Sequence, residues 1–577
     1  MQHSRQIRRA VLLALSLLSG CAASTLGRPD LSDSGAPSAT HLDRPADGTT
    51  SAFLIGRLAG QTGDIQVAAD QFLRALRADP NNLELAQQAF LACLLAGRPE
   101  AQALARAQPG NPAAALLLGD VAAARGDWAE AEARFSALPN QGVTQVLRPL
   151  LIAWAQFGGG RADAALATLR PYTEGEAAGA VYTLHAALIS DLSQRDPEAA
   201  RLYRAAQADF GTPNLLMSQA LASWQARQPD GGAEAARTLA AMAAASSDLA
   251  IALPDLQRHA ADRLARKATD GMALAYLAEA SALRSQNAPD YAALLLRFAI
   301  DLRPDLTAAR LLSAEITDQS KHPESSLAML QPVADDDPLA AVVQERRAAL
   351  LAELSRNGDA LAVLARLQAS HPDRPEPWTL QGAIVRGEKK YAESADAYGQ
   401  AIARTPAPAA ADWVLFYQRG IAFDQARRWP QAEADFKHAL ALQPEQPNVL
   451  NYLAYSWTEQ GIELPLARRM IERAVAQRPN DAAMTDSMGW IMLRQGDVTG
   501  AVRQLERASE LQPEDPTINN HLGDAYRAAG DTLDAQFQWR RALTLNPDQD
   551  EAAGIAAKLK QAGGHAPPPI VKSSAQP

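Results

Sequence analysis

The chain has 577 residues, of which 47% are hydrophobic and 21% are charged, so most of it carries enough apolar material to fold. A formal net charge of −10 argues against a nucleic-acid-binding protein, and two cysteines exclude both a disulfide framework and a cysteine-rich zinc site. Aromatic residues are only 5% while alanine is abundant, which favours closely packed helices over a β-sandwich. We therefore expect an all-α fold.

Residues 1–20 have the pattern of an export signal. Three arginines lie within the first nine residues, and residues 10–18 are apolar but too few to span a bilayer as a helix. The segment ends in Leu18-Ser19-Gly20-Cys21, which resembles the bacterial lipobox. That resemblance implies cleavage before Cys21 and acylation of this residue. The alternative is an ordinary signal peptide followed by a chance cysteine.

The residues after the cysteine predict where the chain is held. Ala22, rather than Asp, follows Cys21, which in lipoproteins of Gram-negative bacteria implies sorting to the outer membrane, facing the periplasm. Residues 21–50 are rich in Ser, Thr, Pro, Gly and Asp, so we expect a lipidated cysteine on a flexible tether. Membrane attachment is then by the lipid anchor alone, because several acyl chains anchor stably without a spanning helix.

From residue 51 onward the sequence repeats with a period of 34 residues. Prolines recur at this spacing, as do small residues and large apolar residues between them. One unit carries Gly489, Ala501, Leu505, Ala508 and Pro513, and the next carries Gly523, Ala535, Trp539, Ala542 and Pro547. The glycine allows two helices to approach closely, and the proline ends the second helix because it lacks an amide proton.

This pattern resembles the tetratricopeptide repeat family over most of residues 51–560. The resemblance implies a right-handed α-solenoid of tandem helix-turn-helix repeats, in which stacked neighbours supply the core that one repeat cannot form alone. The repeats are degenerate over residues 51–270 and clear over residues 271–563. The remaining residues, 564–577, are Pro-rich, and we expect them to be disordered.

Motifs for catalysis are missing from the sequence. It contains no HExxH pair, nucleophile elbow, phosphate-binding loop or dinucleotide fingerprint. Gly158-Gly159-Gly160 fits a turn between helices better than a phosphate cradle, and Cys93 lies in an apolar helix. We therefore predict a protein that is not an enzyme and that binds no metal or cofactor.

In tetratricopeptide arrays, the first helix of each pair lines a groove that binds peptides or helices. We predict groove-facing residues in the last four units because aromatic, amide and charged side chains suit peptide recognition. An alternative for Tyr455 and Trp490 is that they only pack between helices. The lysines of a carboxylate clamp are missing, so no clamp is predicted. The predicted groove residues are Tyr417, Asp424, Asn451, Tyr455, Glu459, Asp486, Trp490, Arg494, Asn520, Asp524 and Arg527.

Three segments (451–455, 486–490 and 521–524) are similar to those of outer-membrane tetratricopeptide lipoproteins, some of which are adaptors of a periplasmic carboxy-terminal processing protease. The resemblance implies a protein-binding scaffold that brings the protease and its substrates, cell-wall hydrolases, together. The alternative is an assembly factor for an outer-membrane secretion, pilus or polysaccharide-export machine. A cell-wall hydrolase with a hidden site is a third hypothesis, which the lack of catalytic motifs disfavours.

Overall fold

The computed structural model describes residues 48–174, 179–210 and 214–563. The predicted signal peptide, Cys21, most of the predicted tether and the Pro-rich residues 564–577 lie outside the described residues. The tether was expected to reach residue 50, but the first described helix, α2, already begins at Gly48. Its early residue Ala52 is buried in a cluster with Ala75 of the following helix, so packing extends the helix into the polar segment.

The described chain divides into two compact units, with the division between Ala369 and Ser370. The sequence-based division at residues 270/271 separated degenerate from clear repeats, and it falls inside helix α16 of unit 1. The helices up to the division are α2 (Gly48–Gln61), α3 (Ile65–Ala78), α4 (Leu83–Leu95), α5 (Glu100–Arg106), α6 (Pro112–Ala124), α7 (Trp128–Ser136), α8 (Val143–Gly158), α9 (Ala162–Thr173), α10 (Ala180–Leu192), α11 (Asp196–Phe210), α12 (Leu215–Ala226), α13 (Gly232–Ala245), α14 (Ser247–Ala250), α15 (Leu253–Arg258), α16 (Ala268–Ser285), α17 (Pro289–Leu302), α18 (Thr307–Gln319), α19 (Pro323–Leu330), α20 (Ala340–Glu353) and α21 (Asn357–Ser370).

Unit 2 has the same helical construction, with one short 3-10 helix. Its elements are α22 (Glu376–Gly387), α23 (Tyr391–Ala403), η2 (Ala410–Asp412), α24 (Trp413–Gln425), α25 (Trp429–Leu442), α26 (Pro447–Gln460), α27 (Leu464–Gln477), α28 (Ala482–Arg494), α29 (Val498–Leu511), α30 (Pro516–Ala529), α31 (Thr532–Thr544) and α32 (Gln549–Gln561). Within the described ranges the ordered structure is helical throughout, which confirms the all-α prediction. Each of these described helices is too short or too polar to cross a lipid bilayer.

Most of the helices form consecutive pairs, and the turn inside the pair contains a residue with positive φ; the turn between the short helices α14 and α15 is an exception. These turn residues recur every 34 positions over long stretches, including the segments where the sequence repeats are degenerate, for example Gly63 and Gly97 or Gly126 and Gly160. Where the turn residue is not glycine it is mostly polar, as with Gln194, which lies 34 positions after Gly160. The backbone period is thus kept where the side-chain pattern has drifted.

Side chains at the helix ends explain where the helices start and stop. Asp497 accepts a hydrogen bond from the backbone N–H of Gly500, and Asp515 accepts one from Ile518, so both satisfy free donors at a helix N-terminus. Helix α29 ends at Leu511, two residues before Pro513, as the proline spacing predicts.

The small residue in each first helix accommodates a large side chain from the second helix. A Cβ atom added to Gly489 would lie 2.5 Å from Cγ of Leu505, and one added to Gly523 would lie 2.5 Å from Cδ1 of Trp539. In unit 1 Gly119 has the same relation to Phe135. These large residues therefore pack against the glycine of their own helical pair.

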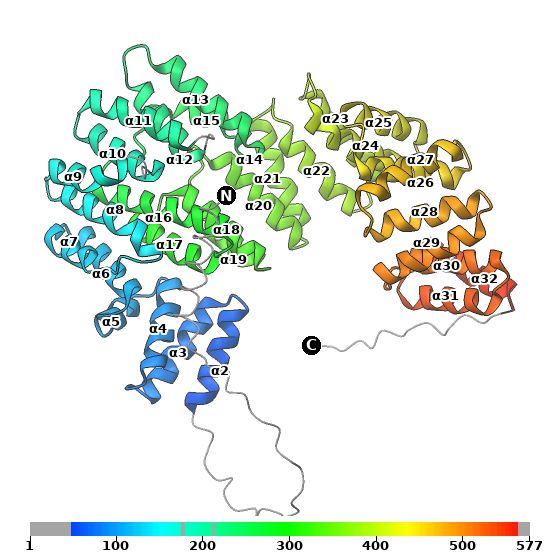
Figure 1. The fold of residues 1–577 in the computed structure, drawn as a ribbon, viewed down its shortest axis with the longest axis horizontal. Coiled ribbons are helices and arrows are strands. Elements are labelled where there is room, and N and C mark those ends of the chain that lie inside the picture. Colours follow the sequence, from blue (N-terminus) through cyan, green and yellow to red (C-terminus); the bar gives the residue numbers. More distant parts are fainter. Residues whose placement is uncertain (1–47, 175–178, 211–213, 564–577) are drawn as a thin grey trace, which may run out of the picture. The chain divides into compact units, whose positions relative to one another are not determined.

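Helix α16 packs in unit 1 against helices that lie far from it in the chain. It contacts α6, α8 and α10, while its partner α17 contacts α4 and α6 (Figure 1). Gly271 of α16 lies so close to Trp154 of α8 that an added Cβ would be 2.1 Å from Cε2 of the indole. Most residues of α16 are buried around the whole helix, so its surroundings within unit 1 enclose it.

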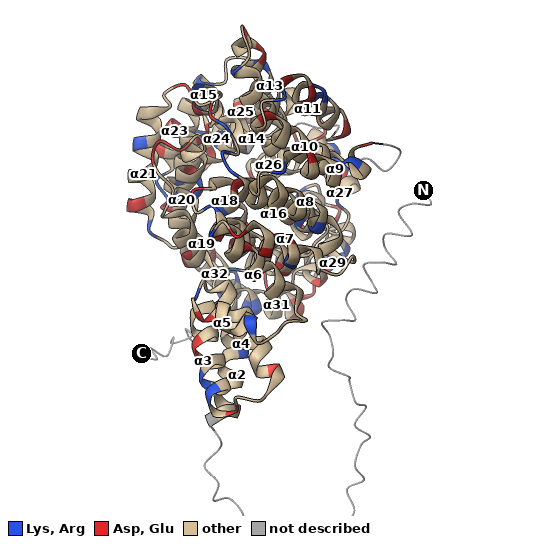
Figure 2. Ribbon diagram, turned by 90° about the vertical axis from the view of Figure 1, so that its left-hand side faces the viewer, with Lys and Arg blue, Asp and Glu red and all other residues tan. Residues whose placement is uncertain are grey.

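Ion pairs at the turns connect neighbouring repeats in unit 1. In each, an arginine directly after the positive-φ turn residue reaches an acidic residue on the second helix of the preceding pair. The pairs are Arg98–Asp70 (2.7 Å), Arg161–Glu132 and Arg195–Asp163 (2.7 Å). All are partly solvated, so each contributes at most about 1 kcal/mol, but they show where the chain runs after a turn. Figure 2 shows basic and acidic residues interspersed along the visible helices.

Candidate functional site

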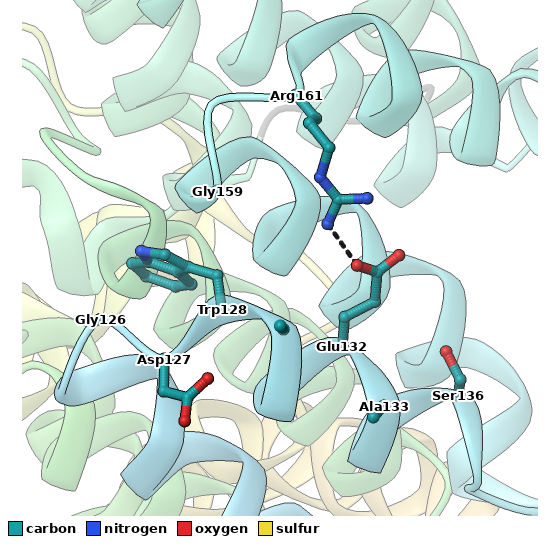
Figure 3. Close-up of a pocket in the computed structure, with 9 residues that line it drawn as sticks. Gly126, Asp127, Trp128, Glu132, Ala133, Ser136, Gly159 and Arg161 are labelled. Carbon is teal, nitrogen blue, oxygen red and sulfur yellow. Dashed lines mark hydrogen bonds and ion pairs between the residues drawn. The ribbon is translucent and has the colours of Figure 1, made fainter.

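A surface cavity of about 730 Å³ lies in unit 1, between α7 and the turn that joins α8 to α9. Trp128 forms one wall, and the ion pair between Arg161 and Glu132 crosses another (Figure 3). The cavity is shallow and open, and its wall includes the glycine turn after α8, in which Gly160 has positive φ. The prediction of a helix–helix turn at this triple glycine is confirmed. Among the lining side chains, the carboxylate of Glu132 is held in an ion pair by the guanidinium of Arg161.

The predicted groove residues come together in unit 2. All of them lie on α24, α26, α28 and α30, the first helices of successive pairs. Side-chain contacts connect each of these helices to the next, and the last reaches α32. We call this connected set the ladder. It consists of Tyr417, Asp424, Tyr452, Tyr455, Glu459, Asp486, Trp490, Arg494, Asn520, His521, Asp524, Glu551 and Lys558, and we include Asn451, which neighbours Tyr452 on α26.

The first contact of the ladder joins α24 to α26. The hydroxyl of Tyr452 donates to Oδ2 of Asp424 at 3.0 Å, and the ring of Tyr417 meets that of Tyr452 edge-on at 6.1 Å between centroids. Burial raises the pKa of Asp424, and the bond from Tyr452 offsets part of this rise. Burial also raises the pKa of Tyr452. Asp424 is therefore held in a fixed position by a neighbour that sequence analysis did not single out.

The second contact joins α26 to α28 through Trp490. Its indole N–H donates to Oε1 of Glu459 at 2.5 Å, and the guanidinium of Arg494 lies 5.8 Å from the centroid of the indole ring. Glu459 and Arg494 are exposed, whereas Trp490 is half-buried. Trp490 is thus packed between helices and also keeps part of its surface open.

The third contact joins α28 to α30 through His521, which the sequence analysis left out of the site. Its ring stacks on Trp490 at 4.2 Å between centroids with an interplanar angle of 14°, and its Nδ1 lies 2.9 Å from Oδ2 of Asp486. Burial works to lower the pKa of His521, but the charge of Asp486 and its hydrogen bond outweigh burial, and the pKa is raised. Tyr455 lies 6.2 Å from the same imidazole ring.

The last contact joins α30 to α32. The ammonium of Lys558 donates to Oδ1 of Asn520 at 2.8 Å and to Oδ2 of Asp524 at 2.6 Å. The amide of Asn520 in turn donates to Oε1 of Glu551 at 3.2 Å. Lys558 lies 34 residues after Asp524, which itself lies 34 residues after Trp490, so the repeat period could have identified this lysine.

The predicted groove residues differ in how much of each side chain a binding partner could contact. Glu459, Arg494 and Arg527 are exposed, and the guanidinium of Arg527 donates to the hydroxyl of Thr532 at the start of α31. Asp486 and Asn520 are buried and bonded within the ladder, so the expectation that they face an open groove is wrong for these two residues. They position the exposed residues instead. The other predicted residues are half-buried: Tyr417, Asp424, Asn451, Tyr455, Trp490 and Asp524.

Asn451 carries an unsatisfied polar atom. Its side-chain carbonyl oxygen is buried without a hydrogen-bond donor among the described residues, while the residue as a whole is half-buried. A buried acceptor without a donor is unfavourable by about 1–3 kcal/mol. Among the described residues no group of His, Cys, Asp and Glu is arranged to hold a metal ion.

Comparison with known families supports tetratricopeptide repeats in both units. A family model described as a TPR repeat matches residues 489–530, and two described as tetratricopeptide repeats match residues 95–141 and 417–482, and residues 49–82. Together these segments cover less than half of the chain. They include most of the ladder and part of the degenerate N-terminal region.

A relative and several solved structures resemble parts of the chain. The TPR repeat-containing protein PA4667 of Pseudomonas aeruginosa is 34% identical over 92 residues, and the match spans only 16% of each protein. The crystal structure of the APC/C hetero-tetramer Cut9–Hcn1 aligns with 89% of this chain and 96% of its own at 16% identity, with a TM-score of 0.37. The yeast Tom70 structure aligns with 89% of this chain and 95% of its own at 11% identity, with a TM-score of 0.33.

Proposed function

We propose that the chain is a lipid-anchored periplasmic scaffold, an adaptor that recruits or activates a carboxy-terminal processing protease and brings cell-wall hydrolases to it. Tetratricopeptide repeats typically bind other proteins, which supports the scaffold role. The lipobox-like Leu18-Ser19-Gly20-Cys21 supports the anchor, and the resemblance to adaptor lipoproteins supports the choice of partners. The observation that carries the proposal is the ladder of unit 2.

The ladder has the features of a surface that binds an extended polypeptide segment. Tyr455 and Trp490 keep part of their aromatic surface accessible, and Trp490 is held in one orientation by Glu459 and His521. A side chain held in this way loses little conformational freedom on binding, which favours affinity.

The charged residues at the edge of the ladder would select among segments. Glu459, Arg494 and Arg527 are exposed and of both signs, so a segment with opposite charges in matching order is favoured. The mechanism of the adaptor is proximity. Holding a protease and its substrate on one membrane-attached scaffold raises their effective concentration to the order of millimolar without any catalytic group in the scaffold.

The test is affinity capture of the detergent-solubilised native chain, with mass spectrometry of the proteins recovered. Three forms are compared: wild type, Arg494→Glu on the ladder and Arg503→Glu on α29. Arg503 is a matched control, since it is an exposed arginine on the second helix of the same pair. Purified protease and hydrolase are then mixed with each form, and the rate of hydrolase cleavage is measured.

We expect the wild type and Arg503→Glu to recover a periplasmic protease with cell-wall hydrolases and to accelerate cleavage, and Arg494→Glu to lose the substrate. Recovery of a secretin or an export subunit, with no effect on cleavage, would reject the adaptor role in favour of an assembly factor. If Arg494→Glu and Arg503→Glu recover the same proteins and give the same rate of cleavage, the ladder is not the binding surface.

A further inference from the structure

Helix α31 exposes two large apolar side chains on one face. The side chain of Leu533 is 81% exposed and that of Phe537 is 60% exposed. Residues four apart lie on the same face of a helix, so the two form one patch. In sequence, they lie two residues on either side of the buried Ala535. Ala535 occupies the same position in its repeat as the buried Ala501 in α29 and Ala68 in α3.

In α29 and α3 the corresponding residues are polar. Relative to the buried alanine, the two positions hold Thr499 and Arg503 in α29, and Gln66 and Asp70 in α3. All four are exposed, so these two repeats present this face to water, whereas α17 has the half-buried Leu294 at one of the two positions. The apolar pair in α31 is therefore a local departure from the pattern and not a requirement of the repeat.

The chain leaves the described structure beside this patch. The side-chain amide of Gln536 donates to the backbone oxygen of Ala562 at 2.6 Å, which places the end of α32 against α31 next to Phe537. Gly563 follows with φ +74°, the conformation of the turn residue inside each helical pair. Residue 564 lies outside the described residues; in sequence it follows Gly563 as Arg98 and Arg195 follow their own turn residues.

Those two arginines show where the chain lies after such a turn. Arg98 bonds to Asp70, and Arg195 bonds to Asp163, each on the second helix of the preceding pair. Asp70 lies two residues after the buried alanine of its helix, and Phe537 lies two residues after Ala535. Asp163 lies two residues before the buried Ala165, and Leu533 lies two residues before Ala535. In both repeats, the residue after the turn contacts one of the two positions that are apolar in α31.

We propose that residues 567–571, Pro567-Pro568-Pro569-Ile570-Val571, dock on the patch formed by Leu533 and Phe537. Three consecutive prolines prevent these residues from forming the second helix of a further pair, and they favour an extended polyproline II conformation. Residues 564–566 span up to about 10 Å and the docked run spans about 15 Å, enough to cover two side chains four residues apart on a helix. The segment therefore replaces the missing helix instead of forming the disordered tail that its composition predicts.

Disulfide trapping in the full chain tests the contact. Leu533→Cys and Ile570→Cys are combined in a Cys21→Ser background, with Asp534→Cys and Ile570→Cys as the matched control. Asp534 is exposed and adjacent in sequence, but it points about 100° around the helix from Leu533. Cys93 stays in place because it is buried and its pKa is raised to about 11, so it remains a protonated thiol.

We expect the Leu533 pair to close within one chain at least about tenfold faster than the control pair, since a docked segment has an effective concentration well above that of a free tether. Equal rates for the two pairs would overturn the proposal. Disulfides between chains in place of those within one chain would also overturn it, and would assign the patch to a second copy.

A second variant keeps the test independent of introduced cysteines. Leu533→Thr combined with Phe537→Arg copies the residues of α29, so the helix should fold as its neighbour does. A lysine-specific protease then cuts after Lys572, and mass spectrometry follows the released fragment. We expect slow release in the wild type and release at least about tenfold faster in the variant, because proteolysis requires an undocked segment. Equally fast release in both forms would contradict docking.

Discussion

The hydroxyl of Tyr276 donates a hydrogen bond to the carboxyl group of Asp120, at 3.0 Å and 3.1 Å from its two oxygens, although the residues are 156 positions apart in the chain. Both side chains are buried, and they connect α16 to α6. This contact and the packing of Gly271 on Trp154 hold α16 against the N-terminal helices of unit 1.

The buried carboxyl group of Asp120 makes the stability of unit 1 depend on pH. Burial raises the pKa of Asp120 well above its ordinary value, and the bond from Tyr276 offsets this only in part. The unfolded chain therefore loses this proton at lower pH than the folded chain, and stability decreases as pH rises above about 4. We expect Asp120→Asn to raise the melting temperature at pH 7, by an amount equivalent to about 1 kcal/mol or more, and to have a smaller effect at pH 4. A lower melting temperature for the variant at pH 7 would contradict the protonated state.

The close approach of Gly271 and Trp154 predicts a steric effect. A methyl group at residue 271 would overlap the indole, so Gly271→Ala should destabilise unit 1 by about 1–3 kcal/mol. Gly554 in α32 is the control, because an added Cβ there meets no atom within 4 Å. Gly554→Ala should stabilise its helix by roughly 0.5–1 kcal/mol. Thermal unfolding followed by circular dichroism measures both, and the prediction fails if the two substitutions shift the melting temperature in the same direction.

The pair formed by His521 and Asp486 predicts a pH dependence in unit 2. The pKa of His521 is raised because Asp486 outweighs burial, so the stabilisation is fully present below about pH 6.5 and is lost as pH rises through the folded pKa. We expect the melting temperature of the unit 2 transition to fall over this range in the wild type and to change less in His521→Gln.

Trp490, stacked on the imidazole of His521, should become more fluorescent as the imidazole loses its charge. Fluorescence titration of the wild type and of Trp490→Phe isolates this signal from the other tryptophans. An identical titration curve for the two proteins would refute it.

The two cysteines allow a direct test of lipidation. Cys93 is fully buried and its pKa is raised to about 11, so it should not react with a thiol reagent in the folded protein at pH 8. If Cys21 is acylated on its sulfur, the chain purified from membranes should show no reactive thiol when folded and one when unfolded. A chain with a free Cys21 would show one reactive thiol when folded and two when unfolded. Cys21→Ser should appear in the soluble fraction, and its retention in the membrane would argue against the lipid anchor.

Much of the ladder could be predicted from the period of the repeat, and some of it could not. Residues such as Tyr455, Trp490 and Asp524 were identified because one helical face recurs every 34 residues. His521 was missed because it lies 35 residues after Asp486, whereas the repeat period is 34. When each helix is considered alone, this shift of one residue places His521 on a different helical face from Asp486. The contact arises only when α28 and α30 are placed side by side. Asp486 and Asn520 were expected to be open for the same reason, because burial by the next helix is not visible within one repeat.

The sequence alone determined the helices, the turns between them and the glycines at which two helices approach closely. These features depend on residues close together in the chain, where spacing and side-chain size decide the contact. Only the tertiary structure decided that α16 is enclosed by α6, α8 and α10, and that Tyr276 meets Asp120. Such contacts depend on the rotation between successive pairs added over many repeats. The 34-residue period sets the size of each step but does not specify that rotation.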